Sequence, residues 1–151
     1  MNLLNIYDPK VVKFDLDVSN KSQAIKEVSK IMFDAGKVND IVKFEEAILE
    51  REKDFPTGIG YGLAIPHCIS DSVNEVSFSF IKLRNEIEWG SLDGNNINII
   101  IMLAAKMGND SEHLKLLSTL ATLLMDDDFR ENLFKSNCEE EVFSFLERKC
   151  G

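Results

Sequence analysis

The sequence predicts an α/β fold in which a single-domain mixed β-sheet is flanked by helices on both faces, an α/β/α sandwich. Residues 12–18 alternate between apolar and polar side chains, which is the period of a half-buried strand. Residues 22–35 repeat apolar side chains at helical spacing, and residues 97–104 are almost all apolar, as in a central strand covered on both faces. No repeat and no linker rich in Pro, Gly or Ser divides the chain, so we expect residues 1–151 to form one domain.

The first half of the chain is expected to place two helices after the opening strand. The helix that begins near Ser22 should stop at Gly36, because glycine commonly follows the last turn of a helix. A second helix fits residues 40–51, where apolar side chains again recur on one side.

The segment 55–68 breaks both periods and is predicted to be a structured loop that leads into a short strand at 63–65. Residues 76–83 then alternate and predict a further strand, with residues 87–89 expected to pair beside it. The punctuating residues of the loop are three alternating glycines and two flanking prolines, namely Gly58, Gly60, Gly62, Pro56 and Pro66.

The last third of the chain is predicted to be helical. A leucine-rich helix should begin at Asp110 or Ser111, one of which caps it, and should end before the acidic run 126–128. Two more helices fit residues 126–134 and 139–148. The apolar stripe of the leucine-rich helix is expected to comprise Leu114, Leu117, Leu120, Ala121 and Leu124.

Charge and composition restrict the class of protein. Of the 151 residues 44% are hydrophobic and 28% charged, and 17 Lys and Arg against 26 Asp and Glu give a net charge of −9 at pH 7. Nucleic acid and anionic lipid attract Lys and Arg, so this balance excludes a protein that coats either and better suits a basic protein partner.

Cysteine use and hydropathy indicate the compartment. Three cysteines without a C-x-x-C pair predict neither a disulfide framework nor a zinc ribbon, and the first ten residues lack the features of a secretory signal. The longest apolar run, residues 99–105, is about a third of the length that a transmembrane helix needs. We therefore expect a cytoplasmic protein that does not span a membrane and uses no metal or cofactor.

His67 is the first candidate for chemistry. It follows Pro66, whose ring fixes its own φ and holds Ile65 extended, so rigid backbone aims the imidazole. Near pH 7 a neutral imidazole can act as a nucleophile, an acid or a base. The alternative is a histidine that only satisfies a hydrogen bond at the end of a strand.

Arg51 and His113 are the two residues that could share a pocket with His67. Arg51 lies on the last turn of its helix, and its planar fork of donors suits a phosphoryl group. Alternatively, it stabilises the helix C-terminus or pairs with Glu46 or Asp54. His113 lies in the first turn of the leucine-rich helix, where it either joins His67 or is a partly buried histidine with no further role.

The glycines at 58, 60 and 62 and the neighbouring Cys68 can each be interpreted in two ways. Alternating glycines let backbone N–H groups approach an anion, or they form an ordinary tight turn. The segment lacks the Lys-Ser/Thr of a P-loop and the helix of a Rossmann fingerprint, so nucleotide binding is disfavoured. Cys68 points away from the face that carries His67, so we interpret it as a small buried residue rather than a catalytic partner.

Taken together, these segments resemble a known family. The pair Arg51-Glu52 and the runs 56–60 and 62–67, the second ending in Ala-Ile-Pro-His, are similar to the active-site signature of the enzyme IIA components of the bacterial phosphoenolpyruvate-dependent sugar phosphotransferase system. The fructose and mannitol type is the most similar branch. The resemblance extends from about residue 22 to about residue 145, and the family fold, a mixed sheet between helices, agrees with the fold class predicted above.

The resemblance implies a phosphocarrier. His67 would accept a phosphoryl group on Nε2 from the phosphorylated histidine-containing phosphocarrier protein and pass it to a cysteine of the IIB component of a IIB/IIC sugar permease, with fructose the preferred sugar. Arg51 would grip the phosphoryl group, and His113 would be the second active-site histidine. The loop expected to bind the phosphoryl group consists of Thr57, Gly58, Gly60 and Gly62.

Two other functions are compatible with the same residues. A regulatory IIA-like protein would accept phosphate in the same way and signal through protein binding instead of sugar transport. A IIA-like domain of a transcription activator would need attached DNA-binding and regulatory domains, for which we expect no room in 151 residues.

Overall fold

The computed structural model describes residues 2–150, so Met1 and Gly151, the ends of the predicted domain, lie outside the described residues. The chain begins with two short 3-10 turns, η1 (Leu3–Asn5) and η2 (Pro9–Val11). The strands are β1 (Val12–Leu16), β2 (Gly58–Gly60), β3 (Leu63–Ala64), β4 (His67–Ser70), β5 (Ser77–Phe78), β6 (Phe80–Ile87), β7 (Ile97–Ile100) and β8 (Leu103–Lys106). The α-helices are α1 (Lys21–Asp34), α2 (Ile41–Asp54), α3 (Asp110–Leu124), α4 (Asp127–Lys135) and α5 (Glu139–Cys150).

The strands form a five-stranded sheet of order β1-β6-β7-β3-β2 and a three-stranded sheet of order β4-β8-β5. The two are continuous in register: Leu63 pairs with Ile99 and His67 with Leu103, so β3 and β4 run along β7 and β8 with one unchanged offset. Backbone hydrogen bonds also cross the break, among them Ile101 N–H to the Ala64 carbonyl at 2.9 Å. Parallel and antiparallel pairs alternate across the strands, which confirms the predicted mixed sheet.

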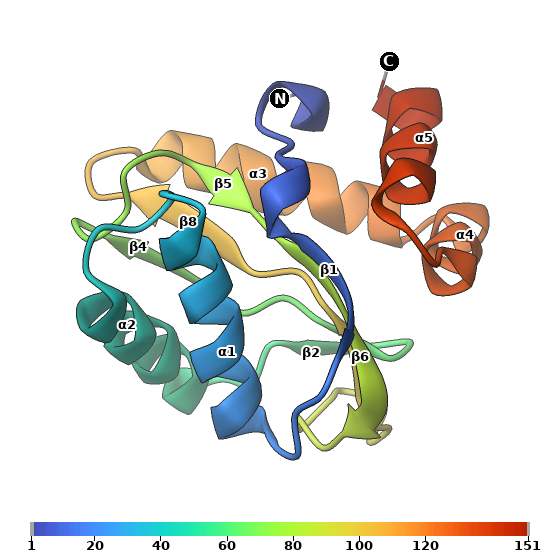
Figure 1. The fold of residues 1–151 in the computed structure, drawn as a ribbon, viewed down its shortest axis with the longest axis horizontal. Coiled ribbons are helices and arrows are strands. Elements are labelled where there is room, and N and C mark those ends of the chain that lie inside the picture. Colours follow the sequence, from blue (N-terminus) through green and yellow to red (C-terminus); the bar gives the residue numbers. More distant parts are fainter. Residues whose placement is uncertain (1, 151) are drawn as a thin grey trace.

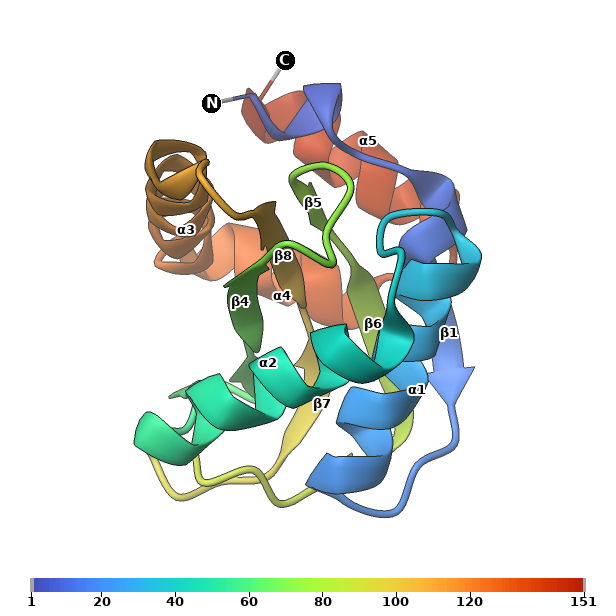
Figure 2. The ribbon, with the colours of Figure 1, turned by 90° about the vertical axis from the view of Figure 1, so that its left-hand side faces the viewer.

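Helices cover both faces of this sheet (Figures 1 and 2), as the fold class predicts. On one face α1 and α2 bury Ile25, Met32 and Phe44 against the strands, and on the other α3, α4 and α5 bury residues such as Leu120 and Phe129. Each such side chain contributes roughly 1.5–3 kcal/mol when fully buried. The η1 turn lies beside α5 at one end of the molecule.

Helix capping explains where the helices begin. The side chains of Asn20, Asp40 and Asp126 accept hydrogen bonds from backbone N–H groups in the first turns of α1, α2 and α4. Gly36 adopts a φ of +79° just after α1, which confirms its predicted role as a stop. Helix α2 continues to Asp54, three residues beyond the predicted end.

The glycine segment is a β-hairpin rather than the loop that the sequence predicts. Strands β2 and β3 are antiparallel and are joined by the two-residue turn Tyr61-Gly62. Both turn residues have positive φ, 57° and 75°, as a type I′ turn requires, and this turn matches the twist of the flanking strands. Tyr61 occupies a turn position that usually carries Asn, Asp or Gly, so the residue types of the turn did not predict a hairpin.

Two further predictions are wrong in detail. Residues 87–89 do not add a strand beside the one before, because Ile87 ends β6 itself and pairs with Ile97 of β7. Helix α3 is preceded by Asn109, which makes no side-chain capping bond, instead of being capped by Asp110 or Ser111.

The buried face of α3 is also rotated from the predicted one. The side chains that it buries are His113, Leu116, Leu120 and Leu124, whereas Leu114 is 66% exposed. Leucines on several sides of a helix allow more than one stripe, so the sequence pattern alone does not select the buried face. The rotation places His113 toward the sheet.

Candidate functional site

His67 is the first residue of β4 and its imidazole is held by the backbone just before it. Its Nδ1 lies 2.8 Å from the carbonyl oxygen of Ile65. A carbonyl oxygen only accepts hydrogen bonds, so Nδ1 must carry the proton and donate it. The neutral ring therefore has its lone pair on Nε2, the other nitrogen.

His113 lies next to His67. It projects from the first turn of α3, is only 6% exposed, and its ring centroid is 5.3 Å from that of His67. Of the two alternatives given by the sequence, the structure places His113 with His67. Its Nδ1 is buried and has no hydrogen-bond partner among residues 2–150.

Both histidines favour the neutral form. Burial is the main cause that lowers the pKa of His67, and the charge of Arg51 lowers it further, against the hydrogen bond to Ile65 and the charge of Glu52, which raise it. Burial also lowers the pKa of His113, followed by the neighbouring His67. An imidazole that is neutral at pH 7 keeps the lone pair that a nucleophile needs.

Arg51 lies in the last turn of α2, and its charge acts on both rings. Its Nη1 donates a 3.0 Å hydrogen bond to the carbonyl oxygen of Phe55, the residue that follows α2. The side chain thus occupies the helix C-terminus, one alternative from the sequence, while its charge lowers the pKa of His67 and His113. One of its five N–H donors is used in this bond, and the others make no hydrogen bond to any described residue, so they could bind an incoming anion.

The hairpin separates the four residues predicted to form a phosphoryl-binding loop. Thr57 lies at its base, where its carbonyl oxygen accepts the Ile65 N–H at 3.0 Å. Gly62 lies at its tip, and the five extended residues from there to His67 span roughly 16 Å. Gly60 also lies near the tip, paired with Leu63, so the structure does not bring Gly60 or Gly62 to His67.

The base of the hairpin is occupied by a residue that the sequence reasoning missed. Glu52 is 6% exposed and accepts hydrogen bonds from the N–H and hydroxyl of Thr57, so neither Thr57 donor points to His67. Gly58 pairs with Ala64 beside it. Its position in the sequence could have indicated a role for Glu52, because a carboxylate in the last turn of a helix interacts unfavourably with the macrodipole and needs partners elsewhere.

Cys68 adjoins His67 and faces the other way. It is 6% exposed, packs into the core between the sheet and helices α1 and α2, and burial raises the pKa of its thiol to about 12. This confirms the prediction of a small buried residue.

The chemistry of the site follows from these placements. His67 has a neutral imidazole whose Nε2 makes no hydrogen bond within residues 2–150, a second imidazole lies beside it, and the charge of Arg51 acts on both rings. The arrangement combines a nucleophile with groups that bind an anion. Residues 2–150 contain no group of three or more His, Cys, Asp or Glu side chains that could hold a metal ion. Within the same part of the chain no helix is long and apolar enough to cross a bilayer.

A separate apolar groove of about 350 Å³ lies at the C-terminal end of α3, where Ile65, Ala121 and Leu124 line it. The exposed side chains of Tyr61 and Met125 flank it, and Arg130 stacks on the Tyr61 ring at 3.9 Å. Such a surface groove suits a protein partner better than a small molecule that must be enclosed.

Comparison with known proteins identifies the family. The family model "Phosphoenolpyruvate-dependent sugar phosphotransferase system, EIIA 2" matches residues 5–149. The chain is 33% identical over 146 residues to the fructose-specific EIIABC component of Bacillus subtilis, a match that covers 97% of this chain and 23% of that protein. It is 31% identical over 146 residues to a nitrogen regulatory protein of Bradyrhizobium diazoefficiens, covering 97% of this chain and 95% of the relative.

A solved structure supports the same assignment. Nitrogen regulatory protein IIA-Ntr from Neisseria meningitidis superposes with a TM-score of 0.86 at 27% identity, over 94% of this chain and 97% of that one. The fold, the paired histidines and the family match agree. The chain therefore belongs to the EIIA 2 family of the phosphoenolpyruvate-dependent sugar phosphotransferase system, of fructose and mannitol type, and is a phosphotransferase with a phosphocarrier role in that system.

Proposed function

We propose that His67 carries the phosphoryl group, which it accepts from the histidine-containing phosphocarrier protein and passes to a cysteine of a IIB component. The observation that carries this proposal is the 2.8 Å hydrogen bond between His67 Nδ1 and the Ile65 carbonyl oxygen. It commits the proton to Nδ1 and leaves Nε2 as the nucleophile. His113 lacks a comparable bond at its own Nδ1, so its tautomer is not fixed in this way.

The proposed transfer consists of two successive displacements at phosphorus. The Nε2 lone pair of His67 attacks phosphorus in line, a new P–N bond forms, and the P–N bond to the carrier's histidine breaks with its electrons returning to that ring. The phosphorylated ring of His67 keeps its Nδ1 proton and gains positive charge, which the Ile65 carbonyl dipole stabilises. In the second step a thiolate of IIB attacks the same phosphorus and the His67 ring leaves as a neutral imidazole.

Arg51 and His113 are the proposed partners of the phosphoryl oxygens. The charge of Arg51 complements the transferred group, and its guanidinium can donate two parallel hydrogen bonds to it. His113 can donate from one ring nitrogen in its neutral form. The glycine segment takes no part in this proposal, because the Thr57 donors bind Glu52 and the turn lies far from His67.

The proposed pathway is sugar uptake in the cytoplasm, with fructose as the sugar and residues 1–151 acting as one IIA domain. The fructose assignment rests on the name of the Bacillus relative, of which this chain spans about a quarter. A regulatory role is the second candidate, because nitrogen regulatory proteins match this chain over nearly their whole length. Phosphoryl transfer from the labelled chain to an isolated IIB domain favours transport, and its absence favours regulation.

Incubation with phosphoenolpyruvate, enzyme I and the phosphocarrier protein tests the assignment. Mass spectrometry should find one acid-labile phosphate, located on His67. His67→Gln should abolish labelling, whereas His113→Gln, which changes the neighbouring imidazole in the same way, should still accept the group. Full labelling of His67→Gln would overturn the proposal.

A further inference from the structure

Glu52 makes an unusual number of contacts for a carboxylate in a helix. Its Oε1 accepts hydrogen bonds from Trp89 Nε1 at 2.8 Å and from the Thr57 hydroxyl at 2.9 Å, and it forms an ion pair with Lys21 Nζ at 3.1 Å. The Thr57 N–H lies 3.1 and 3.2 Å from its two oxygens. Every partner is a donor, which matches the two acceptor oxygens of a carboxylate.

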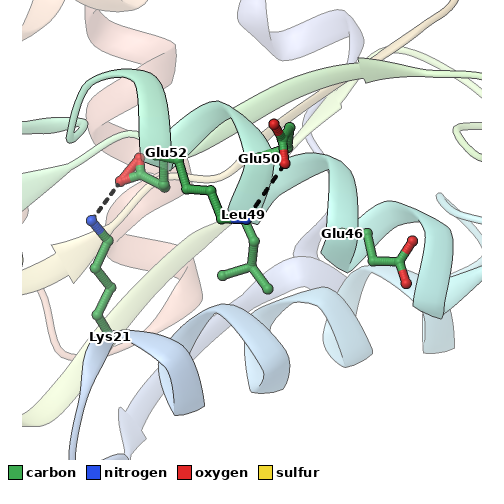
Figure 3. Close-up of a pocket in the computed structure, with 6 residues that line it drawn as sticks. Lys21, Glu46, Leu49, Glu50 and Glu52 are labelled. Atoms are coloured by element: carbon green, nitrogen blue, oxygen red, sulfur yellow. Dashed lines mark ion pairs between the residues drawn. The ribbon is translucent and has the colours of Figure 1, made fainter.

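These contacts join four segments of the chain. Figure 3 shows Lys21 reaching from the first turn of α1 to Glu52 near the end of α2. Thr57 begins the hairpin, and Trp89 lies in the connection between β6 and β7. The Lys21 ammonium also stands 5.0 Å from the centroid of the Trp89 ring, so the ion pair and the indole support each other.

A short chain of hydrogen bonds leads from Glu52 to the imidazole of His67. Glu52 holds Thr57, whose carbonyl oxygen accepts the Ile65 N–H at 3.0 Å. The carbonyl oxygen of Ile65 in turn accepts the Nδ1 proton of His67 at 2.8 Å. Displacing Thr57 would therefore move the carbonyl that selects the reactive tautomer.

Glu52 also closes the turn that holds Arg51. Arg51 precedes it in the chain and donates to the carbonyl oxygen of Phe55, which lies inside the segment that the Glu52–Thr57 hydrogen bonds bracket. The position of the Phe55 carbonyl oxygen, which accepts the hydrogen bond from Arg51, therefore depends on the carboxylate of Glu52 as well.

We propose that Glu52 is a positioning residue that sets the orientation of both the His67 imidazole and the Arg51 guanidinium through the Thr57 turn. The inference deepens the proposed function and rests on it for the transfer step. It assigns Glu52 no contact with the phosphoryl group. A merely structural Glu52 would contribute to stability but would leave the tautomer of His67 and the transfer rate unchanged.

The test is Glu52→Gln in the full chain. Glutamine has nearly the same shape, but its amide must point an N–H₂ group at one of the donors and leaves Lys21 without its counter-charge. Nitrogen-15 NMR should show His67 as a mixture of tautomers instead of one with the proton on Nδ1. The rate of phosphoryl acceptance at saturating phosphocarrier should fall about ten- to a hundredfold, as expected when reacting groups are misplaced, while KM stays close to the wild-type value.

Glu50→Gln is the matched control. Glu50 lies on the same helix with its side chain 75% exposed and pairs only with Lys53 at 3.6 Å among the described residues, so this variant should keep the wild-type tautomer and rate. If Glu52→Gln does not fold, Trp89→Phe removes one donor to the carboxylate and should shift the tautomer in the same direction, to a smaller extent. A wild-type tautomer and rate in a folded Glu52→Gln variant would overturn the inference.

The NMR result separates this inference from the proposed function. If wild-type His67 is never phosphorylated, the proposed function fails, yet a tautomer shift in Glu52→Gln still supports the positioning role. If wild-type His67 is phosphorylated and Glu52→Gln changes neither tautomer nor rate, only the positioning role fails.

Discussion

Replacing Arg51 with Lys keeps the positive charge of this side chain and removes its fork of donors. Within residues 2–150 the Arg51 side chain makes one hydrogen bond, an exposed one to the Phe55 carbonyl oxygen, so its loss should lower the free energy of unfolding by no more than about 1 kcal/mol. During transfer the loss is larger, because a charge-assisted hydrogen bond contributes about 1.5–3 kcal/mol. That difference corresponds to a transfer rate about 10- to 150-fold lower.

Rapid-quench measurement of transfer from the phosphorylated chain to an isolated IIB domain gives the rate, and urea unfolding gives the stability. Arg84→Lys is the control, because Arg84 also binds oxygen acceptors, at Asp15, but lies on β6 away from the histidines. If Arg51→Lys transfers within about threefold of wild type while Arg84→Lys is also unchanged, the fork of donors has no role in the step.

The remaining predictions concern His113, pH and the hairpin. His113→Ala should still accept phosphate at His67 but pass it to IIB about a hundredfold more slowly, as when one preorganised donor is removed; transfer at the wild-type rate would make His113 structural. Burial lowers the pKa of both histidines, so below about pH 6.5 the unfolded chain binds more protons than the folded one. The free energy of unfolding should therefore be level above pH 6.5 and fall toward pH 5, and His67→Gln combined with His113→Gln should flatten that slope in urea titrations. Gly58→Ala would place a Cβ 2.5 Å from Ser91 Oγ and 2.8 Å from Ser91 Cα, and should cost about 1–3 kcal/mol. Gly94→Ala meets nothing within 4 Å, so its cost of about 1–2 kcal/mol should come only from the strain of its φ of +75°; a Gly58→Ala variant with wild-type thermal stability would contradict this account.

Elements with a clear period were predictable from the sequence. The alternation at 12–18 became β1, and the helical repeat from Ser22 became α1, whose first turn is capped by Asn20. The rigid backbone before His67 was also predictable, because Pro66 fixes its own φ and holds Ile65 extended. These features are local, so a short window of sequence contains their physical cause.

Features that depend on distant partners were not predictable. Packing against the sheet determines which side of α3 is buried, so Leu114 is exposed and His113 is buried. The contacts of Glu52 come from Lys21, Thr57 and Trp89, which only the fold brings together. Spacing along the chain therefore contains no information about this cluster.

The burial of Cys68 bears on where a phosphoryl group on His67 could be transferred. A phosphohistidine at His67 has a thiol as its covalent neighbour, and a thiol is the kind of group to which the phosphoryl group is proposed to go next. The pleat of β4 turns Cys68 to the opposite side of the sheet, and the raised pKa keeps it from becoming a thiolate at pH 7. A phosphoryl group on His67, as proposed, would therefore not pass to Cys68 of the same chain, and the cysteine of a IIB component would remain its proposed acceptor.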